Sequence, residues 1–245
     1  MKDNFSKQAL RYSQYRPQYP NELFDFLTNT VSPKNLAWDC GTGNGQTARE
    51  IGKYFKEVYA TDISEKQLTH ASKAGNILYC VEPAEKTALK DKSVNLITIS
   101  QALHWFNLPA FYKEVKRVGA PGAVIAAWAY GLLTITPAID KIIKHYHFET
   151  LKDYWDEERK FVDDAYTNIP FPFNGIPHPQ FYIKANWIIK DLEGYLSTWS
   201  ALQKFIGVKN YNPLADLLQE IKPYWPESVF LPVVFPIHLK LGYVP

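Results

Sequence analysis

Glycines at three alternate positions mark the first segment that could bind a ligand. Residues 39–45 read DCGTGNG, which places Gly41, Gly43 and Gly45 between small polar residues. Apolar residues before them predict a short buried strand over 36–40, and the apolar spacing after them predicts a helix over 46–55. A backbone without side chains can approach a ligand closely. The helix N-terminus behind it favours a negative or strongly hydrogen-bonding group.

The spacing of these glycines argues against a dinucleotide. A dinucleotide fingerprint reads G-x-G-x-x-G, whereas Gln46 stands here in place of the third glycine. Asp39, two residues before the first glycine, would repel a pyrophosphate and attract an ammonium or a sulfonium. A turn that only joins a strand to a helix remains the alternative.

An acidic residue follows at the end of the next apolar run. Residues 57–61 predict a second strand, and Asp62 follows Gly45 at close to the spacing of about 20 residues at which an acidic residue binds ribose hydroxyls in a βαβ unit. Ser64 and Gln67 predict a capping box for a helix over 64–74, which would leave Asp62 free for a ligand. Ile63 would then lie beside an adenine. A purely capping role for Asp62 is the alternative.

Polar residues also follow the fourth predicted strand. Strands over 77–81 and 93–100 are apolar, and the second runs into Gln101, His104 and Trp105. Open α/β sheets bind ligands at the carboxyl ends of their parallel strands. We therefore expect these side chains, and the loop over 82–89, to face one crevice. His104 is the candidate acid or base, with a structural role as the alternative.

The N-terminal segment combines tyrosines, prolines and one arginine. Arg16 stands between aromatic residues just before a predicted helix over 21–30. Above a cofactor pocket it could bind a carboxylate with two parallel hydrogen bonds. The alternative is an arm whose aromatic side chains only cover the domain.

The remaining pattern predicts a single α/β domain over 1–245, with no linker. Its parts are an N-terminal arm and helix over 1–35, a cofactor-binding half over 36–129, an insertion over 130–180, and C-terminal strands and helices over 181–245. The insertion is either a lid over the site or extra packing. Further predicted elements are helices over 108–118, 137–148, 154–165, 191–205 and 212–222 and strands over 123–128, 181–189 and 233–243. Pro236 favours an edge or bulged position for the last strand.

Composition narrows the range of partners. Lys and Arg number 27 against 25 Asp and Glu, a formal net charge of +2, which favours a small substrate over a nucleic acid. The two cysteines, Cys40 and Cys80, fall in predicted strands and suggest buried free thiols and no metal site. No signal peptide or membrane-spanning run is apparent, so we expect a cytoplasmic protein, a monomer or homodimer, without a membrane partner.

Taken together, these segments resemble the class I S-adenosylmethionine-dependent methyltransferases of the methyltransferase type 11 group, which includes trans-aconitate methyltransferase-like proteins. The matching stretches are YSQYRPQYP at 12–20, DCGTGNG at 39–45, DISEKQL at 62–68, Ala84-Glu85, QALHWF at 101–106 and GYLSTWSALQKF at 194–205. The resemblance implies a Rossmann-like, doubly wound sheet of seven mostly parallel strands in the order 3-2-1-4-5-7-6, with strand 7 antiparallel.

The resemblance also implies a cofactor, S-adenosyl-L-methionine, and residues that would contact it. Asp39 and the glycine turn, with Gln101 and Ala102, would surround the methionine part, and Asp62 would bind the ribose. Ile63 and the Ala84-Glu85 segment would surround the adenine, and Tyr12 and Arg16 would approach from above.

Methyl transfer to a small molecule is the expected activity. The acceptor would be a carboxylate or another oxygen nucleophile, aligned mainly by proximity and orientation. A phenol or amine acceptor would need a base, for which His104 is the candidate. A non-catalytic S-adenosylmethionine-binding protein and a nicotinamide-dependent oxidoreductase are alternatives. A nucleic-acid base methyltransferase is disfavoured because no N/D-P-P-Y-type motif follows the fourth strand.

Overall fold

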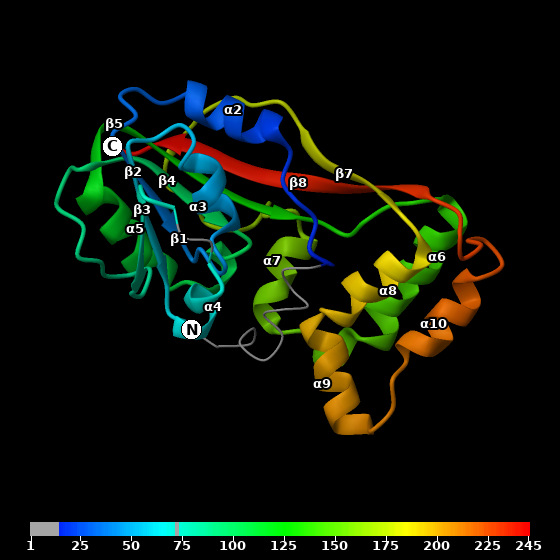
Figure 1. The fold of residues 1–245 in the computed structure, drawn as a ribbon. Helices are drawn as coiled ribbons and strands as arrows, with labels where there is room; N and C mark the ends of the chain where they lie inside the picture. The colour runs from blue at the N-terminus through cyan, green and yellow to red at the C-terminus, as the bar shows by residue number, and fades with distance from the viewer. Residues whose placement is uncertain (1–14, 72–73) are drawn as a thin grey trace.

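A twisted mixed sheet with helices on both faces forms the body of the molecule, as the computed structural model shows for residues 15–71 and 74–245 (Figure 1). The strands are β1 (Leu36–Cys40), β2 (Glu57–Asp62), β3 (Ile77–Val81), β4 (Val94–Ser100), β5 (Gly119–Tyr130), β6 (Asn174–Gly175), β7 (Phe181–Trp187) and β8 (Leu231–Tyr243). The helices are α2 (Asn21–Asn29), α3 (Gln46–Ile51), α4 (Glu65–Thr69), α5 (Leu108–Val118), α6 (Pro137–His145), α7 (Lys160–Asp163), α8 (Ile189–Ser197), α9 (Ser200–Lys209) and α10 (Leu214–Ile221).

The strand order confirms the expected topology. The sheet runs β3-β2-β1-β4-β5-β8, and β7 pairs with β8 as the next strand. Strands β1 to β5 are parallel, whereas β8 is antiparallel to both β5 and β7. With β7 and β8 counted as the sixth and seventh strands, this is the order 3-2-1-4-5-7-6. The two-residue β6, which pairs with the far end of β8, is an addition to that prediction.

The parallel strands are apolar throughout because both of their faces are covered. In β4 every residue from Val94 to Ile99 is buried. Alternate residues of the strands enter two separate core clusters, so that Leu96 packs with α2 and α3 while Ile97 packs with α5. This arrangement fixes the register of the sheet, because a shift of one residue would exchange the two faces.

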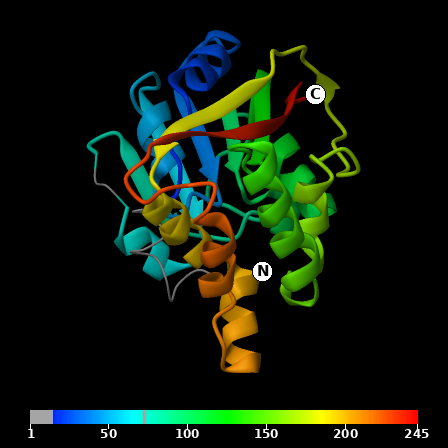
Figure 2. The ribbon, with the colours of Figure 1, turned by 90° about the vertical axis from the view of Figure 1, so that its right-hand side faces the viewer.

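A second group of helices, α6, α8, α9 and α10, gathers at the end where β7 and β8 extend past the parallel strands (Figures 1 and 2). Their apolar faces join the core cluster of α2 and α3 through buried residues such as Ile143, Leu192 and Leu217. Residues of the predicted insertion and of the C-terminal segment therefore share one packed layer. Within the described part of the chain, no helix has the length and apolar character needed to cross a membrane.

Several helices differ from their predicted lengths. Helix α4 ends at Thr69, and α3 ends at Ile51 with Gly52 as its C-cap. The predicted helix over 191–205 is two helices, because the chain turns at Thr198 and Trp199: the Thr198 hydroxyl donates to the carbonyl of Tyr195, and Trp199 is buried. The segment over 154–165 forms short 3₁₀ turns followed by α7 rather than one helix.

The expectation that Pro236 places the last strand at an edge is wrong, because β8 lies between β5 and β7. The carbonyl of Pro236 accepts a hydrogen bond from Gly131, just beyond the end of β5. A backbone amide at this position would point to the same side, so the missing donor of proline breaks no pairing with β7. Of the two cysteines, both free, Cys40 is buried but Cys80 is half-buried.

Candidate active site

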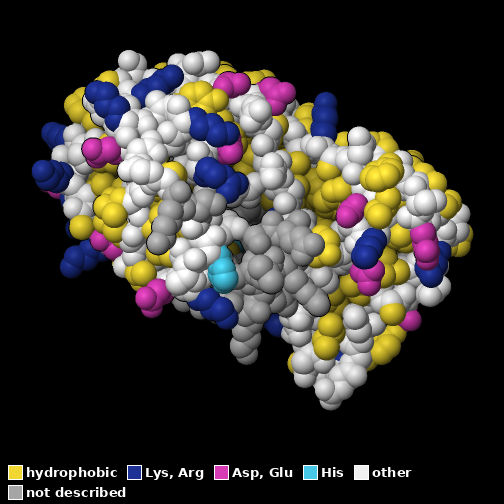
Figure 3. All heavy atoms as spheres, viewed as in Figure 1, with side chains coloured by type: hydrophobic (Ala, Val, Ile, Leu, Met, Phe, Trp, Pro, Cys, Tyr) yellow, Lys and Arg dark blue, Asp and Glu magenta, His cyan; other side chains and the backbone are white. Residues whose placement is uncertain are grey.

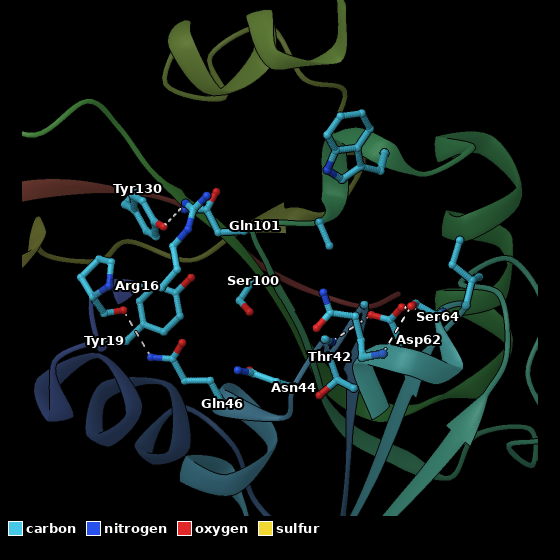
Figure 4. A pocket seen from close by; sticks show the side chains of 17 residues that line it. Arg16, Tyr19, Thr42, Asn44, Gln46, Asp62, Ser64, Ser100, Gln101 and Tyr130 are labelled. Carbon is cyan, nitrogen blue, oxygen red and sulfur yellow. Dashed lines mark hydrogen bonds between the residues drawn. The ribbon is translucent and has the colours of Figure 1, made fainter. Parts of the chain in front are cut away.

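A cavity opens at the carboxyl ends of β1, β2 and β4, between these ends and the segment that precedes α2 (Figure 4). Its walls come from five parts of the chain that are far apart in sequence. The lining residues are Arg16, Pro17, Tyr19, Gly41, Thr42, Gly43, Asn44, Gln46, Asp62, Ile63, Ser64, Gln67, Ser100, Gln101, Ala102, Trp105 and Tyr130. The glycine turn, Asp62 and the residues after β4 thus meet in one place, as the sequence predicted.

The three glycines adopt left-handed backbone conformations, with φ of +68° at Gly41, +56° at Gly43 and +78° at Gly45. A Cβ at Gly41 would lie 2.7 Å from the Cβ of Ala102, so this glycine permits a close approach of two loops. A Cβ at Gly43 would meet no atom within 4 Å. Gly43 therefore leaves space within the cavity, whereas Gly45 does not line it.

Asp39 lies behind the glycine turn and does not line the cavity. Its carboxylate is fully buried and accepts hydrogen bonds from the hydroxyls of Thr42 (2.5 Å) and Thr98 (2.8 Å). Burial raises the pKa of Asp39 to about 6, although these hydroxyls lower it. Asp39 thus holds the turn against β4, and any effect of its charge on a ligand acts across the turn.

Asp62 connects the glycine turn to the start of α4. One carboxylate oxygen accepts the amide of Gly43 (2.8 Å), and the other accepts the amide of Ser64 (2.9 Å). The Ser64 hydroxyl accepts the amide of Gln67, as predicted, but Asp62 also has a local role at the start of α4. That Asp62 binds a ligand stays a prediction. Asp62 nonetheless borders the cavity together with Ile63.

Gln101 occupies the other end of the cavity, beside Arg16 and Tyr130 (Figure 4). Its backbone is left-handed, with φ of +56°, and its amide donates to the carbonyl of Trp128 at 2.8 Å. Its side-chain Nε2 is buried and has no hydrogen-bond partner among the described residues. Buried polar atoms rarely stay unpaired, so this donor indicates a ligand group that accepts it.

Arg16 lies close to both Gln101 and the C-terminal helices. Its guanidinium donates to the hydroxyl of Tyr130 and lies 5.4 Å from the ring centroid of Tyr195. Tyr12, the other residue expected above the cofactor, lies outside the described residues.

Ala84 and Glu85 are not among the residues that line the cavity. Ala84 is buried in the core cluster next to α5. Glu85 accepts the amide of Asn107, at the N-cap of α5. The structure therefore does not bring this pair to the cavity wall, and its contact with an adenine stays a prediction.

His104 lines a second, smaller cavity that shares Arg16, Gln101 and Trp105 with the first. The other residues around this second cavity are Trp155, Asp156, Arg159, Trp199 and Ser200. His104 Nδ1 lies 2.9 Å from the hydroxyl of Tyr166. Burial, and to a smaller degree the charge of Arg159, lower the pKa of His104 to about 3. The imidazole is therefore neutral at physiological pH and a weak proton acceptor.

Sequence reasoning missed several lining residues. Tyr130 ends β5 and Ser100 ends β4, so the rule that sites lie at carboxyl ends of strands could have identified both. Thr42 and Asn44 lie within the glycine motif itself. The residues of the second cavity over 155–159 carry no comparable signal, because only packing brings their segment to the sheet.

Comparison with known proteins places this geometry in a family. A model of the methyltransferase domain matches residues 38–127. A methyltransferase of Dictyostelium discoideum is 36% identical over 98% of this chain and 94% of its own length. A type II methyltransferase structure from Anaeromyxobacter dehalogenans has a TM-score of 0.88 and 35% identity, covering 94% of this chain and 98% of that one. An S-adenosylmethionine-dependent methyltransferase of Saccharomyces cerevisiae is 27% identical over 70% of this chain and 61% of its own length.

The chain belongs to the class I S-adenosylmethionine-dependent methyltransferases. It is therefore a methyltransferase enzyme, and its family implies S-adenosylmethionine as the cofactor.

Proposed function

We propose that the larger cavity binds S-adenosylmethionine and that the enzyme methylates a small molecule at a carboxylate or another oxygen nucleophile. Two features support a fit to this cofactor. The unpaired Nε2 of Gln101 calls for an acceptor, and the space above Gly43 admits a ligand against the backbone. When bound, the cofactor supplies an electrophilic methyl group on a sulfonium.

The lining residues suggest how the cofactor is oriented. Asp62, with Ile63 beside it, would bind the ribose and adenine at one end of the cavity. Gln101 and Arg16 would hold the methionine end, because the Gln101 Nε2 calls for an acceptor there and Arg16 adds a positive charge beside it. The backbone at Gly41 and Gly43 would lie between these ends. The second cavity then adjoins the reacting end of the ligand.

The burial of His104, which lowers its pKa, supports a carboxylate as the acceptor. A phenol or an ammonium must lose a proton before it attacks carbon, and an effective base has a pKa near the working pH. His104, with its pKa lowered to about 3, is a poor base. Asp156, the other acid or base around the second cavity, is paired with Lys204 at 2.7 Å. A carboxylate is already ionised at neutral pH and needs neither residue as a base.

Alignment would then supply most of the catalysis. Holding donor and acceptor in attack geometry can lower the activation barrier of a bimolecular reaction by roughly 7–11 kcal/mol. Arg16 and Gln101 border both cavities, so the same side chains can position the two reactants. His104 would act as a neutral wall of the acceptor cavity.

The surface supports a small acceptor rather than a polyanion. On the face in Figure 3, acidic and basic side chains both occur among hydrophobic ones. The formal net charge is only +2. A nucleic acid would favour a coherent basic surface.

The test is a methyl-transfer assay with radiolabelled S-adenosylmethionine and a panel of organic acids, phenols, amines, RNA and protein. We expect transfer to organic acids, recovered as base-labile methyl esters. His104→Asn should lower kcat by less than the roughly 100-fold expected for loss of a general base. Transfer confined to RNA or protein, or to amines with His104 required, would contradict the proposal.

A further inference from the structure

Arg159 is the cation that belongs to the second cavity alone. Arg16 borders both cavities, whereas Arg159 lines only the second, together with His104 and the tryptophans at 155 and 199. Its charge is close enough to lower the pKa of His104. A change at Arg159 should therefore affect an acceptor separately from the cofactor.

The guanidinium of Arg159 is held in place on two sides. Its Nε donates to Asp163 at 3.1 Å, and its central carbon lies 5.0 Å from the ring centroid of Trp155. Asp163 also binds the Nε2 of His147 at 3.2 Å. This bracing orients the planar group before any ligand arrives, which lowers the entropic cost of binding.

The aromatic support of Arg159 is itself fixed. The indole N–H of Trp155 donates to the carbonyl of His147 at 3.1 Å, and its ring lies 5.4 Å from that of Trp199. His147 is buried within the π-helical turn Tyr146–Thr150. Trp155 therefore has little freedom to release the guanidinium.

Among residues 15–71 and 74–245, no group forms a hydrogen bond with either terminal amino group of Arg159; only its Nε is bonded. The side chain keeps 24% of its surface exposed. Asp156, the carboxylate nearest in sequence that also lines the cavity, is paired with Lys204. A fixed guanidinium with both terminal groups available matches the two oxygens of a carboxylate.

We propose that Arg159 is a specificity-determining residue that anchors a carboxylate of the methyl acceptor other than the one that is methylated, while Asp163 acts as its positioning residue. This inference rests on the proposed function, because it requires the acceptor to be an organic acid. Trp155 and Trp199 would cover the carbon skeleton beside the anchored group. Binding at Arg159 draws electron density from a carboxylate, so this residue contributes to affinity rather than to the attacking step.

The test compares Arg159→Gln and Arg159→Lys with Arg49→Gln, a matched change at an exposed arginine on α3. Each variant is assayed with the organic acid that the wild-type enzyme methylates best, chosen among acids with two or more carboxylates, and with an analogue in which a carboxylate that is not methylated is an amide. We expect KM for the acid to rise by about 10- to 100-fold in Arg159→Gln, the range for losing hydrogen bonds to a charged group. The KM of Arg159→Lys for the acid should lie between those of the wild type and Arg159→Gln, because lysine keeps the charge but not the planar pair of donors.

Two binding measurements separate the possible failures. Titration with S-adenosylhomocysteine should give the same Kd for the wild type and for each variant, and tryptophan fluorescence should report weaker binding of the acid only in the Arg159 variants. An unchanged KM and an unchanged preference for acid over amide in Arg159→Gln would overturn the role of Arg159. If the wild type methylates no acid in the panel, the proposed function itself fails, whatever the variants do.

Discussion

At the scale of single residues, the site depends on backbone conformations that favour glycine and on one residue that adopts such a conformation without being glycine. Gly43 keeps the cavity open, and Gln101 has φ of +56° while its side-chain Nε2 has no hydrogen-bond partner in the described part of the chain. Strained backbone at a non-glycine residue is typical of functional sites. The strain at Gln101 holds a donor toward the cavity, where a ligand can accept it.

Gly43→Val should weaken cofactor binding, while its loss of stability should be no greater than that of a control substitution at another glycine with positive φ. The new side chain would occupy the space that the cavity offers, since no atom lies within 4 Å of its Cβ. Gly122→Val is the matched control, because Gly122 also has positive φ and open space but lies at the start of β5. Both variants should lose roughly 1–2 kcal/mol of stability from backbone strain.

Isothermal titration with S-adenosylmethionine should then show at least about a tenfold loss of affinity for Gly43→Val alone, or about 1.4 kcal/mol. Equal affinities in the two variants would mean that the ligand does not approach Gly43.

At the scale of elements, α5 is bound to the loop between β3 and β4. Arg117 donates to the carbonyls of Thr87 and Leu89 and to the carboxylate of Glu114. Glu114, which is largely buried, also accepts the amide and hydroxyl of Thr87. This network positions the loop that carries Ala84 and Glu85.

Arg117→Ala should lower the free energy of unfolding by about 2 kcal/mol, because it removes hydrogen bonds to a charged group and leaves Glu114 without its cation. The neighbouring exposed Lys116→Ala should change stability by less than about 0.5 kcal/mol. Urea denaturation of both variants measures the difference. Similar stabilities would show that the loop is held without Arg117.

At the scale of the whole molecule, two buried groups give stability opposite dependences on pH. His104 has its pKa lowered from 6.5 to about 3, so below pH 6.5 the unfolded chain binds a proton that the folded chain does not. The contribution of His104 to the free energy of unfolding therefore decreases progressively as pH falls from 6.5 toward 3. Asp39 has its pKa raised from 3.8 to about 6, so its contribution is full below 3.8 and is lost as pH rises through 6.

Replacing His104 should therefore reduce the loss of stability in mild acid. Between pH 7.5 and pH 5.0 the histidine contributes a loss of about 2 kcal/mol, whereas Asp39 acts in the other direction in both proteins and cancels from the comparison. Urea unfolding of the wild type and His104→Asn at the two pH values measures this difference, with His70→Asn as an exposed control. An identical pH dependence in the wild type and His104→Asn would contradict the lowered pKa.

Local patterns alone determined the strands β1 to β4, the glycine turn and the polar residues that follow β2 and β4. Apolar runs and turn residues act over a few neighbours, so their positions can be read from spacing. The expected strand order came from the resemblance of several such segments taken together.

Only the tertiary structure decided which side chains face the cavity. Asp39 and Asp62 both stand beside the glycines, yet packing buries the first behind the turn and leaves the second at the cavity wall. Arg16 and Arg159 come from segments that local spacing does not relate, yet both line the second cavity. Their meeting depends on how the helices pack at the end of the sheet, a long-range balance of burial and hydrogen bonding that sequence spacing does not encode.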